Sequence, residues 1–474
     1  MSDLGTGTTA LVRALLADAT PARSDSERLA QLIAGVPRPT AQESWLVLSV
    51  LGRRLPLAAE VDAFRRTAVA DGMDVAIAAV VRARRSPLRW RDREVHVVTD
   101  TVVLDVHDSA LTTLLTGVQR VSRALADSWL PRGAMLVGWN SSRTQLLPIR
   151  DGAWTTRSRR SPFESHAIVP WGGWFTLPEV VTDIDRTKRI AVLAEHSGAR
   201  SMLIGDDAIP MTTAETTGPK MPGVFAKYLV AASRMDVVAC ISEAAATEYS
   251  GWKRMLASAG LEGPSVRTVM LAESAETPDP AARERAAARF ISTDERGELP
   301  LVLCVGSHEP RKNHDAVLHA AELLWREGHR FSLAFVGGNA WSSEEFRTTL
   351  RGLQESGRHV EAMRGIDDDL LWWAYRLARF TVFPSLNEGF GLPVTESLQS
   401  GTPVVTSNFG SLAEIAAGGG CVLVDPRDDR SIADGMRSLL ADEALRDTLA
   451  DQAASRPERS WAQYSGEVWN LLME

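Results

Sequence analysis

The sequence has 474 residues, which is long enough for two to four compact units with sizeable hydrophobic cores. It is 45% hydrophobic and 24% charged, a composition typical of soluble globular proteins and unlike that of a disordered or membrane-embedded chain. The formal charge of -8 argues against nucleic acid as the main partner, because binding to a phosphate backbone requires an excess of lysine and arginine.

The cysteines and the first residues of the sequence bear on the compartment in which the protein is expected. Cys240, Cys304 and Cys421 lie far apart and no Cys-x-x-Cys pair occurs, so neither a disulfide framework nor a zinc site is indicated. The segment MSDLGTGTTA lacks the basic and apolar regions of a signal peptide, and no apolar run has the length of a membrane-spanning helix. We therefore expect a cytoplasmic protein.

Residues 1–95 are predicted to form an all-helical appendage, because apolar residues recur there at helical spacing. They form two stripes, which are Trp45, Leu48 and Leu51, and Val61, Phe64 and Ala68. The block ends in a basic run made of Arg82, Arg84, Arg85, Arg89, Arg91 and Arg93. A solvated linker is favoured for this run, and a patch for anionic lipid headgroups, with peripheral association at the inner face of a membrane, is the alternative.

From residue 96 to about 275, short β-branched runs alternate with helical patterns, which predicts βαβ units around a parallel sheet. The predicted strands cover 97–106, 134–137, 167–169, 190–193, 202–204, 237–241 and 266–270. A helix is expected to begin near Gly117. The stretch 273–300 is polar and rich in proline and alanine, and we interpret it as an interdomain linker that carries one short helix.

A second alternation of the same kind predicts another unit over 276–460. Its predicted strands cover 301–305, 331–336, 380–383, 403–406 and 421–424. Two successive doubly wound, Rossmann-like units place a cleft between them, and such folds bind ligands at the carboxyl ends of their parallel strands.

The densest cluster of candidate site residues follows the predicted strand 380–383, in FPSLNEGFGLPVTESLQSGTPVV. Glu388 belongs to a glycine-rich loop at the carboxyl end of this strand, and Glu396 lies about one turn into the next helix. Gly389 and Gly391 let backbone N–H groups approach a phosphate or a sugar hydroxyl, and a helix start favours an anion. Buried carboxylates accept hydrogen bonds from vicinal hydroxyls, so this pair suits a ribose or a pyranose better than a metal.

The Glu-x7-Glu pattern within EGFGLPVTES, followed by SGTPVV, resembles the donor-site signature of glycosyltransferase family 4, whose members are retaining enzymes with the two-domain GT-B fold. The resemblance implies a nucleoside diphosphate sugar as donor substrate, with no metal and no further cofactor. Glu388 is then expected to hold the transferred sugar. The implied donor-binding residues that surround it are Glu396, at the ribose, and Gly389, Phe390, Gly391 and Leu392. An accidental pair of glutamates in an ordinary strand-loop-helix unit is the competing interpretation.

Arg311 and Lys312 lie in GSHEPRKNHDAVLHA, which is similar to the diphosphate-binding turn of the same family. Two cations beside the N–H groups of a helix start can neutralise a diphosphate leaving group as charge develops on it. Lysine accounts for only five of the 52 basic residues, and Lys312 is the only lysine after residue 253, which indicates a need for a compact ammonium group. A helix-start ion pair with Glu309 is the alternative.

Further segments extend the resemblance. RGIDDDLLWWAYRLARF is similar to the segment whose main chain contacts the nucleobase, which implies Gly365 and Ile366 beside the base. LTTLLTGVQRVSRAL resembles a stretch of bacterial mannosyl- and rhamnosyltransferases of this family. That similarity implies Gly117 near the donor phosphate, with Gln119 and Arg120 as polar contacts.

The acceptor side departs from the family pattern at one position. LIGDDAIPMTTAE is similar to a His-Asp-x-Ile-Pro turn, but Asp206 occupies the histidine position, which puts a histidine function there in doubt. Asp207 is retained as an acceptor-side candidate. His196, in AEHSGA, is a candidate to replace the missing histidine in space, and a structural histidine is the competing interpretation.

The expected protein is a retaining, metal-independent hexosyltransferase. It would transfer mannose, from GDP-mannose rather than dTDP-rhamnose or a UDP-hexose, to a glycan or lipid-linked acceptor in surface polysaccharide synthesis. In GT-B proteins a terminal helix, here 461–474, returns to the first domain, although periodicity alone predicts a plain surface helix equally well. A catalytically inactive glycan-binding or scaffold protein of the same fold is the alternative. A dinucleotide oxidoreductase is disfavoured, because no Gly-x-Gly-x-x-Gly links a strand to a helix.

Overall fold

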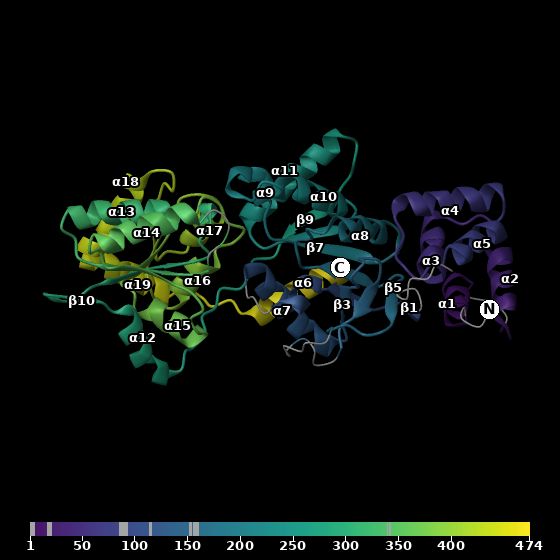
Figure 1. Ribbon diagram of the computed structural model, residues 1–474, viewed down its shortest axis with the longest axis horizontal. Coiled ribbons are helices and arrows are strands. Elements are labelled where there is room, and N and C mark those ends of the chain that lie inside the picture. The colour runs from purple at the N-terminus through teal and green to yellow at the C-terminus, as the bar shows by residue number, and fades with distance from the viewer. Residues whose placement is uncertain are drawn as a thin grey trace.

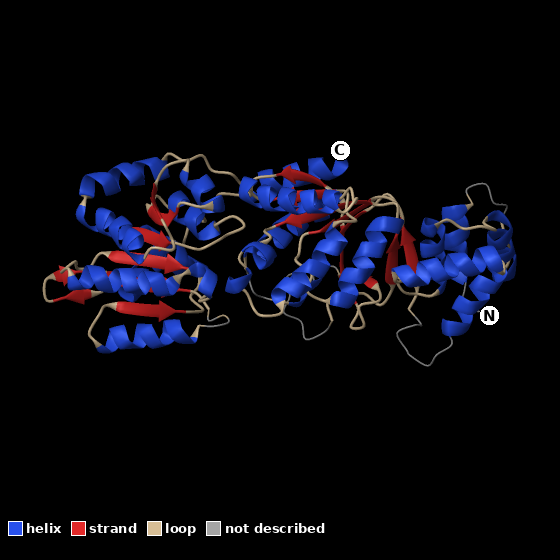
Figure 2. Cartoon of the chain, turned by 90° about the horizontal axis from the view of Figure 1, so that it is seen from above, coloured by secondary structure: helices blue, strands red, loops and turns tan. Residues whose placement is uncertain are grey.

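The computed structural model describes residues 5–16, 21–84, 93–112, 116–150, 154, 161–338, 340 and 343–474. Within these ranges the chain forms a group of helices, a nine-stranded sheet with its helices and a six-stranded sheet with its helices. Figure 1 shows these three parts in a row, with the nine-stranded sheet in the middle, and Figure 2 shows the same order from above. The predicted α/β architecture with an amino-terminal helical appendage is confirmed.

The appendage begins the chain and is helical in all its described segments. Its helices are α1 (Gly5–Leu15), α2 (Asp25–Gly35), α3 (Ala41–Leu51), α4 (Ala58–Ala70) and α5 (Met73–Arg84). Both predicted stripes face its core, where Trp45, Val61 and Phe64 are buried. α3 starts at a capping box, in which Thr40 and Glu43 each accept a hydrogen bond from the backbone N–H of the other.

The appendage shares one hydrophobic core with the first sheet and its helices. Within it, α3 packs against α8 (Ile184–His196), a helix of the first part. The ring of Trp171 stacks on that of Trp45 with centroids 6.4 Å apart, and the Arg189 side chain donates to the carbonyl of Leu55 at 3.1 Å. The predicted boundary at residue 95 therefore does not separate two independent cores. Arg85, Arg89 and Arg91 of the basic run lie outside the described residues.

The first sheet is parallel except around one strand. Its strands are β1 (Val95–Val98), β2 (Val102–Asp105), β3 (Met135–Trp139), β4 (Leu146–Pro148), β5 (Ala167–Pro170), β6 (Trp174–Leu177), β7 (Arg200–Gly205), β8 (Val237–Cys240) and β9 (Ser265–Thr268). They pair in the order β1-β5-β4-β3-β2-β6-β7-β8-β9, with β4 antiparallel to both neighbours. The other α-helices of this part are α6 (His107–Leu111), α7 (Gly117–Trp129), α9 (Ile209–Thr212), α10 (Met221–Ala232) and α11 (Glu243–Ser258).

Two strand predictions for this part were wrong. The single strand expected over 97–106 is two strands, β1 and β2, which are not neighbours in the sheet and are divided by a turn with Asp100 at φ 49°. The strand expected over 190–193 lies inside α8, which Asp183 caps by accepting hydrogen bonds from two backbone N–H groups. Periodicity alone does not distinguish an apolar run of four residues in a strand from one in a buried helix. Here the run lies near the end of a 13-residue helix. Strands β4 and β6 were not predicted.

The second sheet is parallel throughout. Its strands are β12 (Leu301–Val305), β13 (Ser332–Val336), β14 (Val360–Met363), β15 (Phe380–Phe383), β16 (Val404–Ser407) and β17 (Cys421–Val424). Their order, β14-β13-β12-β15-β16-β17, is that of a doubly wound sheet, in which the chain adds strands first on one side of β12 and then, from β15 on, on the other side. The helices of this part are α13 (His314–Arg326), α14 (Glu344–Glu355), α15 (Asp368–Leu377), α16 (Leu392–Gln399), α17 (Gly410–Ala416), α18 (Asp429–Ala441) and α19 (Glu443–Ala454).

The segments that join the two sheets are packed rather than extended. α12 (Arg283–Phe290), in the predicted linker, packs on α15 and buries Phe290 in the second part, and the hairpin of β10 (Thr293–Asp294) and β11 (Gly297–Glu298) follows it. The terminal helix α20 (Trp461–Met473) packs on α7 of the first part, where Trp129 Nε1 donates to the carbonyl of Ser465 at 3.0 Å. The chain therefore crosses between the two parts twice.

Candidate active site between the two sheets

A cavity of about 580 Å³ lies where the carboxyl ends of the two sheets meet. The second part contributes the loops after β12 and β15, the neighbouring strands at which the strand order of its sheet switches sides. The first part contributes the start of α7 and the turn after β7. The predicted site residues that line it are Gly117, Arg120, Asp207, Arg311, Lys312, Glu388, Gly389, Phe390, Gly391, Leu392 and Glu396. Residues from four distant segments of the sequence are thus brought together at the place where doubly wound sheets bind ligands.

Glu388 is the centre of a charged cluster on the second part. Lys312 Nζ donates to its Oε1 at 2.6 Å, and Arg311 Nη1 approaches its Oε2 to 2.6 Å. Ser385 Oγ also donates to Oε1, at 2.7 Å. The ion pair with Glu309 that the sequence offered as an alternative is formed by Arg311, whose guanidinium lies 2.6 Å from the Glu309 carboxylate. Lys312 pairs with Glu388 instead.

Burial and ion pairing have opposite effects on the pKa values of Glu388 and Lys312. Burial alone would raise the pKa of Glu388, but Arg311, Lys312 and the hydrogen bonds outweigh it and lower this pKa to about 2. Burial lowers the pKa of Lys312, which the Glu388 carboxylate opposes. The cluster therefore presents an ionised carboxylate between two cations, and any anion that enters the cavity competes with Glu388 for them.

Glu396 is held from both sides of the cavity. It is 4% exposed on α16 and accepts a hydrogen bond from Tyr375 of α15 at 2.7 Å. Its other oxygen pairs with Arg120, which lies on α7 of the first part. The guanidinium of Arg120 also lies over the ring of Trp461, 5.9 Å from its centroid. The predicted donor-side glutamate and the predicted acceptor-side arginine thus form one interdomain contact.

The loop after β15 packs directly against the first part. Ser242, which also caps α11, donates to the carbonyl of Gly389 at 2.6 Å. Asn387 donates to Glu248 of α11 at 3.1 Å. Gly391 has φ 122°, a left-handed conformation that favours glycine just before α16 begins. Phe390 lies in a core cluster that includes residues of both sheets, which fixes the loop between them.

Replacing Gly389 by alanine is expected to lower turnover of the donor by about 10- to 100-fold, because small misplacements of site loops carry costs of this order. A Cβ atom at this position would lie 2.3 Å from the carbonyl oxygen of Asp206, so the loop and the first part must separate. Steady-state kinetics would measure the effect. Gly352→Ala is the matched control, since its Cβ would have no neighbour within 4 Å and alanine suits helix α14. Unchanged turnover in Gly389→Ala would contradict the close contact.

Four predicted site residues do not line the cavity. Gln119 accepts a hydrogen bond from Thr116 at the start of α7. Gly365 and Ile366 follow β14, which β13 and β12 separate from β15 in the sheet. His196 ends α8 and precedes the amino end of β7, whereas the cavity is at the carboxyl end, so the structure does not place it where it could replace the histidine missing at Asp206.

Two site residues were missed by sequence reasoning. Ser385 lies three residues before Glu388 in PSLNE and bonds its carboxylate, and its position between a strand and the glycine-rich loop was a usable signal. Tyr375 lies in the helix WWAYRL, where nothing in the spacing distinguishes a tyrosine that reaches Glu396 from a core aromatic.

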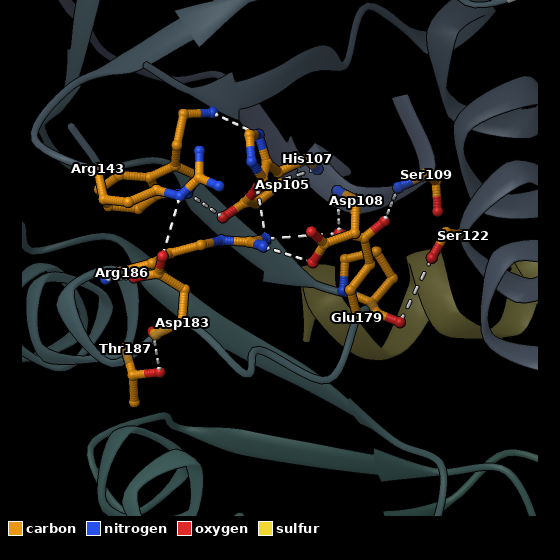
Figure 3. Close-up of polar contacts among 12 residues, drawn as sticks. Asp105, His107, Asp108, Ser109, Ser122, Arg143, Glu179, Asp183, Arg186 and Thr187 are labelled. Atoms are coloured by element: carbon orange, nitrogen blue, oxygen red, sulfur yellow. Dashed lines mark hydrogen bonds and ion pairs between the residues drawn. The ribbon is translucent and has the colours of Figure 1, made fainter. Parts of the chain in front are cut away.

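A buried polar network lies beside the cavity, at the carboxyl ends of β2 and β6 (Figure 3). Arg186 of α8 is 1% exposed and pairs with Asp105 at 3.0 Å, Asp108 at 2.7 Å and Glu179 at 3.5 Å. Glu179 in turn accepts backbone N–H groups at the start of α6, at 2.8 and 2.6 Å. Burial and Arg186 lower the pKa of His107 to about 4, so this histidine is neutral and accepts from the backbone N–H of Trp139 at 3.0 Å.

The network predicts an unusual pH dependence of stability. Burial raises the pKa of Glu179 to about 7, against the lowering effect of Arg186, whereas an unfolded glutamate titrates near its ordinary value. Between these values the folded state holds more protons than the unfolded state, so Glu179 makes stability fall as pH rises.

The free energy of unfolding of the native chain minus that of Glu179→Gln is expected to fall by about 3 kcal/mol from pH 4.5 to pH 7.5. Urea titrations of both proteins across this range would measure the difference. A difference that rises with pH would show instead that Arg186 keeps Glu179 ionised at low pH.

No group of three or more histidine, cysteine, aspartate or glutamate side chains within the described residues is arranged to hold a metal ion. Among the same residues, no helix has both the length and the apolar composition required to cross a bilayer.

The two facing Rossmann-like parts, with a charged cavity between them and a terminal helix that returns to the first, define a GT-B glycosyltransferase fold. Sucrose-phosphate synthase from Thermosynechococcus elongatus has the same fold, with a TM-score of 0.58, 18% sequence identity, and alignment of 80% of this chain with 99% of that one. Residues 287–456, within the second part, match the family described as "Glycosyl transferases group 1".

Two proteins with similar sequences are named for different transfer reactions. The chain is 26% identical over 339 residues, 68% of its length, to the serotype-specific mannosyltransferase WbdA of Escherichia coli. It is 35% identical over 175 residues, 35% of its length, to a D-inositol 3-phosphate glycosyltransferase of Frankia alni. The matches span about two fifths of the length of these relatives, 38% and 42% respectively.

Proposed function

We propose that the chain is a retaining, metal-independent hexosyltransferase that transfers mannose from GDP-mannose to a glycan or lipid-linked acceptor in surface polysaccharide synthesis. The observation that carries the proposal is the cluster of Glu388, Arg311 and Lys312, with Glu396 nearby, in one cavity between the two sheets. The similarity to WbdA over 68% of the chain supports mannose as the sugar.

The cluster suits a diphosphate sugar in its charges. A diphosphate that enters the cavity takes Arg311 and Lys312 from Glu388, and the released carboxylate is then free to accept hydrogen bonds from sugar hydroxyls. Glu396, already a hydrogen-bond acceptor, suits the two hydroxyls of the ribose. On donor binding, the ion pairs among Glu388, Arg311 and Lys312 are thus replaced by contacts of the same residues with the phosphates and the sugar.

In the proposed reaction the bond between the anomeric carbon and the diphosphate oxygen breaks, and an acceptor hydroxyl oxygen bonds to the same face of that carbon. The hydroxyl proton passes to the departing diphosphate. Lys312 and Arg311 stabilise the charge that develops on this leaving group, in a cavity where burial strengthens each contact. The presence of the complete charged set favours this proposal over an inactive scaffold.

A panel of nucleotide sugars tests the proposal. Purified protein would be incubated with GDP-mannose, dTDP-rhamnose and UDP-hexoses, with release of nucleotide and nucleotide-induced melting shifts as the two measurements. GDP-mannose is expected to give the fastest release and the largest shift. Neither release nor a shift with any member of the panel would contradict a glycosyltransferase function.

A further inference from the structure

We propose that Glu248, on α11 of the first part, is a positioning residue for the diphosphate site of the second part. It acts through Asn387, whose side chain it binds and whose backbone carbonyl holds Arg311. This inference rests on the proposed function and deepens it, since it concerns the placement of a cation assigned to the leaving diphosphate. A contact that merely holds the two parts together is the competing interpretation.

Glu248 is itself fixed by the acceptor-side segment that follows β7. Its Oε2 accepts from the backbone N–H of Ala208 at 2.7 Å, and its Oε1 accepts from Thr212 Oγ1 at 3.0 Å. Tyr249, the next residue of α11, donates to the carbonyl of Asp207 in the same segment at 3.2 Å. The first part therefore sets the position of the Glu248 carboxylate through its own hydrogen bonds.

This carboxylate reaches the loop after β15 through the side chain of Asn387. Asn387 is 5% exposed, and its Nδ2 donates to Glu248 Oε1 at 3.1 Å and to Thr212 Oγ1 at 3.2 Å. A buried amide that loses such a partner carries the cost of an unsatisfied polar group, so the pair restricts where the loop can lie. The loop that carries Glu388 is thereby tied to the acceptor-side segment.

The backbone of Asn387 in turn orients Arg311. Arg311 Nη1 donates to the carbonyl of Asn387 at 2.8 Å, and Nη2 pairs with Glu309 at 2.6 Å. In the proposed function a diphosphate takes Arg311 from Glu388, so these two contacts are the ones among the described residues that still orient the guanidinium. Because a guanidinium binds phosphate through a planar fork, its orientation decides how well the diphosphate is held.

The pair of Glu248 and Asn387 acts from outside the cavity. Neither of these two described residues lines it, whereas Arg311 does. A change in the pair is therefore expected to alter donor binding through Arg311 and not through direct contact. The diphosphate part of the binding energy should fall, and the nucleoside part should remain.

Asn387→Asp tests this expectation, because it places two carboxyl groups at hydrogen-bond distance. It is expected to weaken binding of the nucleoside diphosphate by about 10- to 100-fold, the range for a lost hydrogen bond to a charged group. Affinity for the nucleoside alone should not change. The two ligands are the nucleoside diphosphate that corresponds to the largest melting shift in the panel above, expected to be GDP, and its nucleoside. Calorimetric titration would measure both Kd values.

The double variant Asn387→Asp with Glu248→Gln restores the hydrogen bond with donor and acceptor exchanged. The introduced amide donates to the introduced carboxylate, and its oxygen still accepts from Ala208. This variant is expected to recover most of the lost affinity for the nucleoside diphosphate. Glu262→Gln, an exposed change in the segment after α11, is the control and should bind both ligands as the native chain does.

The outcomes separate positioning of Arg311 from a general structural effect. Equal losses of affinity for the nucleoside diphosphate and the nucleoside in Asn387→Asp would overturn the inference, as would native affinity for both. A double variant that recovers nothing would remove Glu248 from the role, because the loss would then come from the charge introduced at position 387. No binding of either ligand to the native chain would mean that the proposed function itself is wrong, and this inference with it.

Discussion

Lys312→Ala is expected to lower kcat by about 100- to 1,000-fold, the usual cost of removing one group that stabilises charge in a transition state. Lys312 lies 2.6 Å from Glu388 and next to Arg311, in the part of the cavity assigned to the leaving diphosphate. The KM for the acceptor is expected to change little, because Lys312 comes from the donor side. Steady-state kinetics with both substrates varied would separate the two effects.

The matched control is Lys227→Ala, which removes an exposed lysine of α10 that does not line the cavity. It should leave kcat unchanged. Lys312→Arg is informative too, since it keeps the charge and replaces a compact ammonium by a planar fork, and an intermediate kcat is expected. Full turnover in Lys312→Ala would remove this residue from the leaving-group site.

Arg186→Met is expected to lower the free energy of unfolding by about 3–5 kcal/mol, because removing one partner of a buried ion pair leaves uncompensated charge in the core. Three carboxylates surround this guanidinium, and two of them, Asp105 and Glu179, are buried with it. Urea-induced unfolding of the purified proteins would measure the loss.

The control is Arg437→Met, which breaks surface pairs with Glu327 and Asp434 and should cost less than about 1 kcal/mol. Combining Arg186→Met with Asp105→Asn and Glu179→Gln should recover part of the loss, since the uncompensated charges are then removed. Equal losses for Arg186→Met and Arg437→Met would contradict a buried network.

The strands of the second sheet could be predicted closely. β12, β15 and β17 begin and end at the expected residues, because each is a short apolar run rich in β-branched or aromatic residues. β14, with two exposed residues among four, has no such pattern and was missed. The first sheet was harder, since β4 contains a proline and pairs antiparallel within an otherwise parallel sheet.

The site could be predicted where local sequence carries the chemistry. Glu388, Lys312 and the glycines after Glu388 share short motifs with defined positions relative to strands, and they meet in the cavity. The pairing of Arg120 with Glu396 joins positions 276 residues apart, and no local pattern reports it. His196 failed because the strand expected over 190–193 would have placed it after a carboxyl end, whereas this segment lies in α8 and His196 precedes the amino end of β7.

A crystal structure with GDP bound tests the central claim most directly. The proposal predicts the diphosphate within hydrogen-bond distance of Lys312 and Arg311, and the ribose hydroxyls at Glu396 in place of Arg120. A nucleotide bound elsewhere, or one that leaves the pairs of Glu388 and Glu396 unchanged, would contradict the assignment of this cavity to a nucleotide sugar.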